Sequence, residues 1–128
     1  MTANVVDSSA WLEYFADGPN AKHFAAAIED TASLRVPSIS VLEVFKRVSQ
    51  QRDDAAALQC VAVMQQSQVV DLDAALAIRA AAVGKRLKLP LADSIIYATA
   101  QSVGAIVWTQ DADFDGLAGV RYWPKRGQ

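Results

Sequence analysis

Short runs of β-branched residues alternate with alanine-rich stretches of helical periodicity along the whole chain. The apolar runs predict strands at residues 3–7, 34–37, 68–71, 105–109 and 120–123. Helices are expected at residues 9–16, 19–30, 40–51 and 54–66, then where Leu72, Leu76, Arg79 and Val83 recur, and after Pro90. This alternation predicts a single α/β domain, residues 1–128, built as a sandwich around a mostly parallel, roughly five-stranded sheet flanked by helices.

Composition narrows the class of protein. With 52% apolar and 20% charged residues, the chain is able to bury a core, which excludes a disordered or collagen-like chain. Cys60 is the only cysteine, so one chain forms neither a disulfide nor a Cys-based zinc site. No apolar run approaches the length of a membrane span, and we expect a soluble, cytoplasmic protein. Residues 124–128 are expected to fray.

Two acidic residues in the first half of the chain come after predicted strands. Asp7 ends the first strand and precedes a helix, so it is placed either to cap that helix or to line a ligand crevice at the carboxyl edge. Glu43 follows Ser40 at the spacing of a capping box, in which its carboxylate would bond back to the helix start. The same position would also aim Glu43 into the crevice.

Further acids occur in the second half of the chain. Asp93 lies in the first turn of the helix after Pro90, where the helix dipole favours a carboxylate, but its neighbours are apolar. Asp111 and Asp113 follow the strand at 105–109, and Asp111 is nearer the strand end and therefore the better ligand candidate. Asp115 precedes a glycine and fits an ordinary turn.

These acids are expected to meet at one edge of the sheet, because the carboxyl ends of parallel strands lie together. Asp7, Glu43, Asp93 and Asp111 would repel one another there unless a cation neutralised them or one of them held a proton. Oxygen ligands of this kind suit Mg²⁺, with Mn²⁺ as a substitute. The sequence thus predicts a divalent-metal site.

The same segments resemble a known family. DSSAW, SVLEV, LPLADSIIYATA and WTQDADF occur in the order of the acidic motifs of PIN-domain ribonucleases, and the chain is most similar to the VapC toxins of bacterial toxin-antitoxin pairs. The resemblance implies a PIN-like fold, Mg²⁺-dependent endoribonuclease activity, a homodimer and inhibition by a VapB-type antitoxin. A toxin of this kind would contact DNA only through its antitoxin. By position, Asp7, Glu43, Asp93 and Asp111 match the acidic quartet, with Asp7 and Asp93 as the main metal ligands.

Other positions bear on substrate binding. Thr109 matches a hydroxyl position of the family and would orient a ligand or phosphate, whereas Gln110 departs from the usual pattern. RNA binding requires positive charge, which two clusters offer close in sequence to Glu43 and Asp93. They are Lys46 with Arg47, and Lys85 with Arg86 and Lys88; both clusters also fit a solvated helix surface.

Aromatic residues and the single histidine have less specific interpretations. Trp11, Tyr14, Phe15 and Phe45 fit either the core or a groove for an antitoxin helix, while Trp108 is expected in the core. His23 is expected on the surface, and one histidine excludes a two-histidine ribonuclease mechanism within one chain.

Two other functions remain open from the sequence. One is a PIN-like module that binds RNA or protein without turnover. The other is a phosphoryl-transfer domain of the HAD or receiver type, although Ser9 stands where the HAD pattern requires a second acid.

Overall fold

Five parallel strands form the centre of the computed structural model, which describes residues 2–126. Their order across the sheet is β3-β2-β1-β4-β5, and all four neighbouring pairs are parallel, as the sequence predicted. The strands are β1 (Ala3–Val6), β2 (Leu34–Pro37), β3 (Gln68–Val70), β4 (Ala105–Thr109) and β5 (Val120–Tyr122). The helices are α1 (Ser8–Phe15), α2 (Ala21–Ile28), α3 (Ser38–Gln51), α4 (Asp54–Met64), α5 (Ala74–Leu87) and α6 (Leu91–Ser102).

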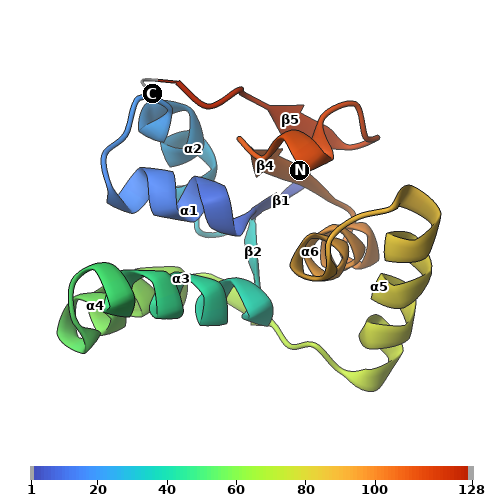
Figure 1. The fold of residues 1–128 in the computed structure, drawn as a ribbon, viewed down its shortest axis with the longest axis horizontal. Helices are drawn as coiled ribbons and strands as arrows, with labels where there is room; N and C mark the ends of the chain where they lie inside the picture. The colour runs from blue at the N-terminus through green and yellow to red at the C-terminus, as the bar shows by residue number, and fades with distance from the viewer. Residues whose placement is uncertain (1, 127–128) are drawn as a thin grey trace.

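Helices cover both faces of the sheet. Because successive side chains of a strand point to opposite faces, Val6 packs into the core beneath α1 to α4, whereas Val5 packs against α5 and α6. Figure 1 shows α5 and α6 together on one side and the other four helices on the opposite side. Trp108 lies in the core, as predicted, and so does Trp11, whose side chain is fully buried.

The strand order reverses between β1 and β4. From β1 the chain builds outward to β2 and β3, whereas β4 and β5 lie on the other side of β1. Val6 pairs with Trp108, and the backbone N–H of Asp7 donates to the Trp108 carbonyl at 3.1 Å. The residues that follow β1 and β4 therefore leave the sheet side by side, where open parallel sheets bind ligands.

The helices begin within a few residues of the predicted positions, and two of the differences change the interpretation of a residue. Pro37 is the last extended residue of β2 and α3 begins at Ser38, so Ser40 is inside the helix and not at its cap. The helix therefore has no Ser40–Glu43 capping box, and that alternative for Glu43 is wrong. Leu72, which the periodicity placed in the next helix, is exposed and precedes α5. The Asp73 carboxylate caps this helix by accepting from the Leu76 N–H at 2.8 Å.

The segment after β5 was expected to fray from Pro124 onward. Instead, the Trp123 N–H donates to the Thr109 carbonyl at 3.0 Å, and the Pro124 carbonyl accepts from Asn20 Nδ2 at 3.0 Å. Residues 127–128 lie outside the described part of the chain. Among residues 2–126, no helix is long and apolar enough to cross a membrane.

Candidate active site

A cavity of about 970 Å³ lies at the carboxyl ends of β1 and β4, between α1 on one side and α3 and α4 on the other. The acids that the sequence analysis singled out come from four different segments of the chain. The cavity lining includes all four: Asp7, Glu43, Asp93 and Asp111. The fold thus brings the predicted quartet to one place, although what these acids do there stays a prediction.

Asp7 is buried and held from several directions. Its carboxylate caps α1 by accepting from the Ala10 N–H at 3.1 Å, and the Ser9 hydroxyl lies 3.0 Å from both of its oxygens. The predicted cap is therefore confirmed, and the same carboxylate also lines the cavity. Burial raises the pKa of Asp7 to about 7, although hydrogen bonds from Ala10, Ser9 and Thr109 lower it.

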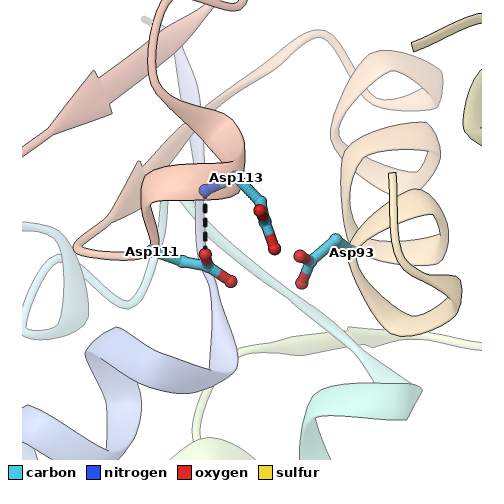
Figure 2. A group of neighbouring side chains, drawn as sticks. All are labelled: Asp93, Asp111 and Asp113. Atoms are coloured by element: carbon cyan, nitrogen blue, oxygen red, sulfur yellow. Dashed lines mark hydrogen bonds between the residues drawn. The ribbon is translucent and has the colours of Figure 1, made fainter. Parts of the chain in front are cut away.

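Three other carboxylates approach one another directly. Asp93, from the first turn of α6, faces Asp111 and Asp113 from the turn after β4, with one oxygen of each within 4.8 Å of the others (Figure 2). The turn is ordered locally, because Asp111 Oδ1 accepts from the Asp113 N–H at 2.9 Å and the Asp111 N–H donates to Thr109 Oγ1 at 2.8 Å. Thr109 thus positions the acidic turn.

The electrostatics of this cluster favour a cation. Burial and the negative charges of Asp111, Asp7 and Asp113 raise the pKa of Asp93 to about 8. The close group offers oxygen atoms only, which fits Mg²⁺ or Mn²⁺ better than a softer metal. Asp7, expected as a main ligand, lies beside this group and not within it. Asp113, which was ranked below Asp111, belongs to it.

Glu43 is positioned by a serine that the sequence analysis had treated only as part of a motif. Ser8 Oγ donates to Glu43 Oε1 at 2.6 Å and also lies 3.2 Å from the hydroxyl of Ser40, which is fully buried. Ser8 belongs to α1 and Glu43 to α3, so this bond joins the two sides of the cavity. A separation of 35 residues hid the pair from any local pattern.

The two basic clusters differ in position. Lys46 and Arg47 are exposed and line the cavity beside Glu43. Lys85 and Arg86 lie in the last turn of α5, are exposed to solvent and do not belong to the cavity lining. Arg52 and Lys125, which the sequence analysis passed over, line the cavity as well.

A buried polar network supports the rim near Asp111. Gln110 is 5% exposed; its Oε1 accepts from Asn20 Nδ2 at 3.1 Å, and its Nε2 lies 3.4 Å from Glu13 Oε1. Glu13 in turn accepts from the Asn20 backbone N–H at 2.8 Å. Gln110, which departs from the family pattern, therefore has two hydrogen-bond partners: Glu13 on α1 and Asn20 just before α2. The sequence patterns singled out neither partner.

The aromatic residues considered for a partner groove pack at the core. Tyr14, Phe15 and Phe45 are partly buried against it, together with Leu12 of α1. Phe15 and Leu12 also line the cavity. His23, expected on the surface, is only half-exposed because its ring stacks on Trp123 with the ring centres 5.2 Å apart.

The family model of the PIN domain matches residues 5–120, and the chain belongs to this family. Its membership excludes the HAD-like and receiver-like alternatives. A comparison with curated protein sequences gives no match.

Solved structures share the fold at low sequence identity. A toxin-antitoxin complex from Klebsiella pneumoniae is similar with a TM-score of 0.78 and 22% identity, over 93% of this chain and 96% of that one. The sarcin-ricin loop cleaving toxin VapC20 of Mycobacterium tuberculosis gives a TM-score of 0.77 at 18% identity, over 92% and 97%. VapBC2 from Rickettsia felis, bound to a DNA fragment from its promoter, gives 0.74 at 12%, over 95% and 99%.

Proposed function

We propose that this chain is a Mg²⁺-dependent endoribonuclease that hydrolyses RNA phosphodiester bonds and acts as the toxin of a toxin-antitoxin pair. The observation that carries the proposal is the carboxylate group Asp93, Asp111 and Asp113, with Asp7 beside it, at the carboxyl edge of a PIN-domain sheet. One structural relative is a toxin that cleaves the sarcin-ricin loop, which supports RNA as the substrate.

The acids would take two different parts in this reaction, metal binding and proton transfer. Asp93, Asp111 and Asp113 would hold the Mg²⁺ ion, with Asp7 completing the negative site from the end of β1. The ion supplies Lewis acidity, which neutralises phosphate charge and makes water a stronger acid near neutral pH. Glu43, fixed by Ser8, orients a water molecule or takes up its proton. Attack by water leaves a 5′-phosphate and a 3′-hydroxyl.

The protein's other residues would bind the substrate and a partner. Lys46 and Arg47, which line the cavity with the acids, would contact RNA phosphates. Leu12, Phe15 and Val63 give the cavity an apolar part that suits a helix of a VapB-type antitoxin. Toxin-antitoxin complexes among the structural relatives support such a partner, and we expect a cytoplasmic homodimer that contacts DNA only through the antitoxin.

The test is cleavage of mixed cellular RNA by the purified, antitoxin-free protein, in Mg²⁺ and in EDTA. Asp7→Asn and Asp93→Asn should abolish the Mg²⁺-dependent cleavage. Asp115→Asn is the matched control, because Asp115 is an exposed acid in the turn that carries Asp111 and Asp113 but lies outside the cavity lining. Circular dichroism verifies that each variant folds.

Two results would refute the nuclease. One is a wild-type protein that cuts nothing in Mg²⁺ or Mn²⁺, and the other is cleavage that both site variants retain. In either case, a PIN-like module that only binds RNA or protein becomes the better description.

A further inference from the structure

Aromatic packing fixes the segment after β5 against α2 and β4. Trp123 stacks on His23 at 5.2 Å and on Trp108 at 5.5 Å, and the edge of Phe24 meets it at 5.5 Å. Its backbone N–H donates to the carbonyl of Thr109, two residues before Asp111. The chain therefore leaves Trp123 in a defined direction, beside the end of β4 that precedes Asp111.

Asn20 ties the next residue to the same rim. Its side chain is fully buried, and Nδ2 donates both to the Pro124 carbonyl at 3.0 Å and to Gln110 Oε1 at 3.1 Å. Its backbone N–H donates to Glu13 of α1. Through its side-chain amide and its backbone N–H, Asn20 thus connects the segment after β5, the residue that precedes Asp111, and α1.

Lys125 follows directly, and it lines the cavity together with Asp7 and Asp111. The cavity also contains Lys46, Arg47 and Arg52, all from α3 or its end, whereas Lys125 comes from the side of α1. The chain has a net charge of −2, so a polyanion gains no general attraction from the protein. Phosphates beside the acidic cluster therefore need local cations, and the cavity offers them on both sides.

We propose that Lys125 binds a backbone phosphate of the RNA strand, opposite the cations of α3, and that Asn20 and Trp123 position it for this contact. The inference rests on the proposed ribonuclease function and adds a substrate-binding residue to it. The RNA strand would then cross the groove between α1 and α3, with its scissile phosphate at the carboxylates.

The experiment measures binding of a fluorescein-labelled single-stranded RNA of randomised sequence, by anisotropy in EDTA at several salt concentrations. Lys125→Ala should weaken binding about 3- to 10-fold, and the slope of log K against log salt should fall by about 0.7, as expected for one lost phosphate contact. Lys125→Arg should retain both values. Arg126→Ala is the matched control, because Arg126 is also an exposed cation but lies outside the cavity lining.

Cleavage kinetics in Mg²⁺ give a second readout. Lys125→Ala should raise KM with little change in kcat, because the contact is made equally in the ground state and the transition state. Asn20→Ala should reproduce part of the loss in binding, and it should add little to Lys125→Ala in the double variant. A thermal melt verifies that Asn20→Ala is folded at the assay temperature.

The failures of the two proposals are distinguishable. If the wild type binds and cleaves RNA but Lys125→Ala and Arg126→Ala match it in affinity and salt slope, the role of Lys125 is refuted and the nuclease stands. A loss confined to kcat, with an unchanged slope, refutes it too. A wild-type protein that neither binds nor cleaves RNA overturns both proposals.

Discussion

The Asp7 carboxylate stabilises α1 and at the same time lines the acidic cavity. Helix capping and metal binding place different requirements on the charge of this side chain. An N-cap needs only an oxygen acceptor, which a neutral Asn side chain also provides, whereas a metal site needs the negative charge. The raised pKa of Asp7 indicates that the charged form is unfavourable in the folded protein when no cation is bound.

Asp7→Asn should therefore separate stability from activity. At pH 8 without divalent ions, we expect the variant to melt at or above the wild-type temperature, because the cap remains and a buried charge is removed. Mg²⁺ should raise the melting temperature of the wild type more than that of the variant, and RNA cleavage should fall at least about 100-fold. Melting curves with and without Mg²⁺ measure this. A variant that melts well below the wild type at pH 8 would contradict the argument.

Single residues were predictable where a local rule applied to them. Asp7, Asp93 and Asp111 each stand at a strand end or helix start, so their convergence followed from the parallel sheet. The bond between Ser8 and Glu43 depends on how α1 and α3 lie across the cavity, which no short motif encodes. Sequence spacing alone suggested a cap for Glu43 instead.

At the scale of helices, Glu43 and Asp53 provide a contrast. Asp53 caps α4 by accepting from the Ala56 N–H at 2.7 Å, whereas Glu43 lies in the second turn of α3 and caps nothing. Asp53→Ala should lower the free energy of unfolding by about 1 kcal/mol. Glu43→Gln should change it by less than about 0.5 kcal/mol while reducing cleavage. Urea titrations and the RNA assay measure both, and a large stability loss in Glu43→Gln would restore a structural role for this residue.

The packing of α5 on α6 gives another prediction for helices. A Cβ at Gly84 would lie 2.8 Å from Ser94 Oγ and 2.9 Å from its Cβ, and the Ser94 hydroxyl is bound to the Pro90 and Leu91 carbonyls. Gly84→Ala should therefore cost about 1–3 kcal/mol and weaken Mg²⁺ binding, because α6 carries Asp93.

Ser94→Gly removes the clashing atoms and supplies the control. In that background, Gly84→Ala should stabilise the protein, since Ala favours helix over Gly by up to about 1 kcal/mol. Denaturation of the four proteins of this cycle measures the coupling. Additive effects would show that the two helices adjust without strain.

The positions of whole helices also decide which basic residues line the cavity. Lys85 and Arg86 are near Asp93 in sequence, but the last turn of α5 presents them to solvent outside the cavity. Lys125 lies beyond β5, and the packing of Trp123 together with the hydrogen bond from Asn20 to the Pro124 carbonyl brings it to the cavity. Proximity along the chain predicts position within one helix and fails across a turn between two.

For the whole molecule, the strand order concentrates negative charge at one edge of the sheet. β1 and β4 are central neighbours, and their following residues together with α6 supply the acids. The sequence predicted this edge because the parallel direction of the strands brings their carboxyl ends together, whereas the strand order is known only from the structure. The cavity between α1 and α3 also required the helix packing, which the pattern of apolar residues leaves undetermined.

This concentration of charge should make stability depend on pH. In the folded protein the pKa values are about 7 for Asp7 and about 8 for Asp93, whereas an unfolded Asp titrates near ~3.9. Between these limits the folded state binds more protons than the unfolded state, so stability falls as pH rises. The decrease is at most about 1.4 kcal/mol per pH unit for the buried Asp7 and smaller for the half-buried Asp93, whose charge is screened by solvent. It ends above the folded pKa values.

Urea denaturation in EDTA from pH 5 to pH 9 measures this dependence. The wild type should lose stability across that range, and Asp7→Asn should lose less, because one of the two groups no longer titrates. Saturating Mg²⁺ should stabilise the protein most at high pH and flatten the curve, since a bound cation favours the ionised carboxylates. The opposite result would be a wild-type stability in EDTA that rises with pH relative to that of Asp7→Asn. It would mean that the protein itself already neutralises the carboxylates, so that this edge of the sheet needs no cation.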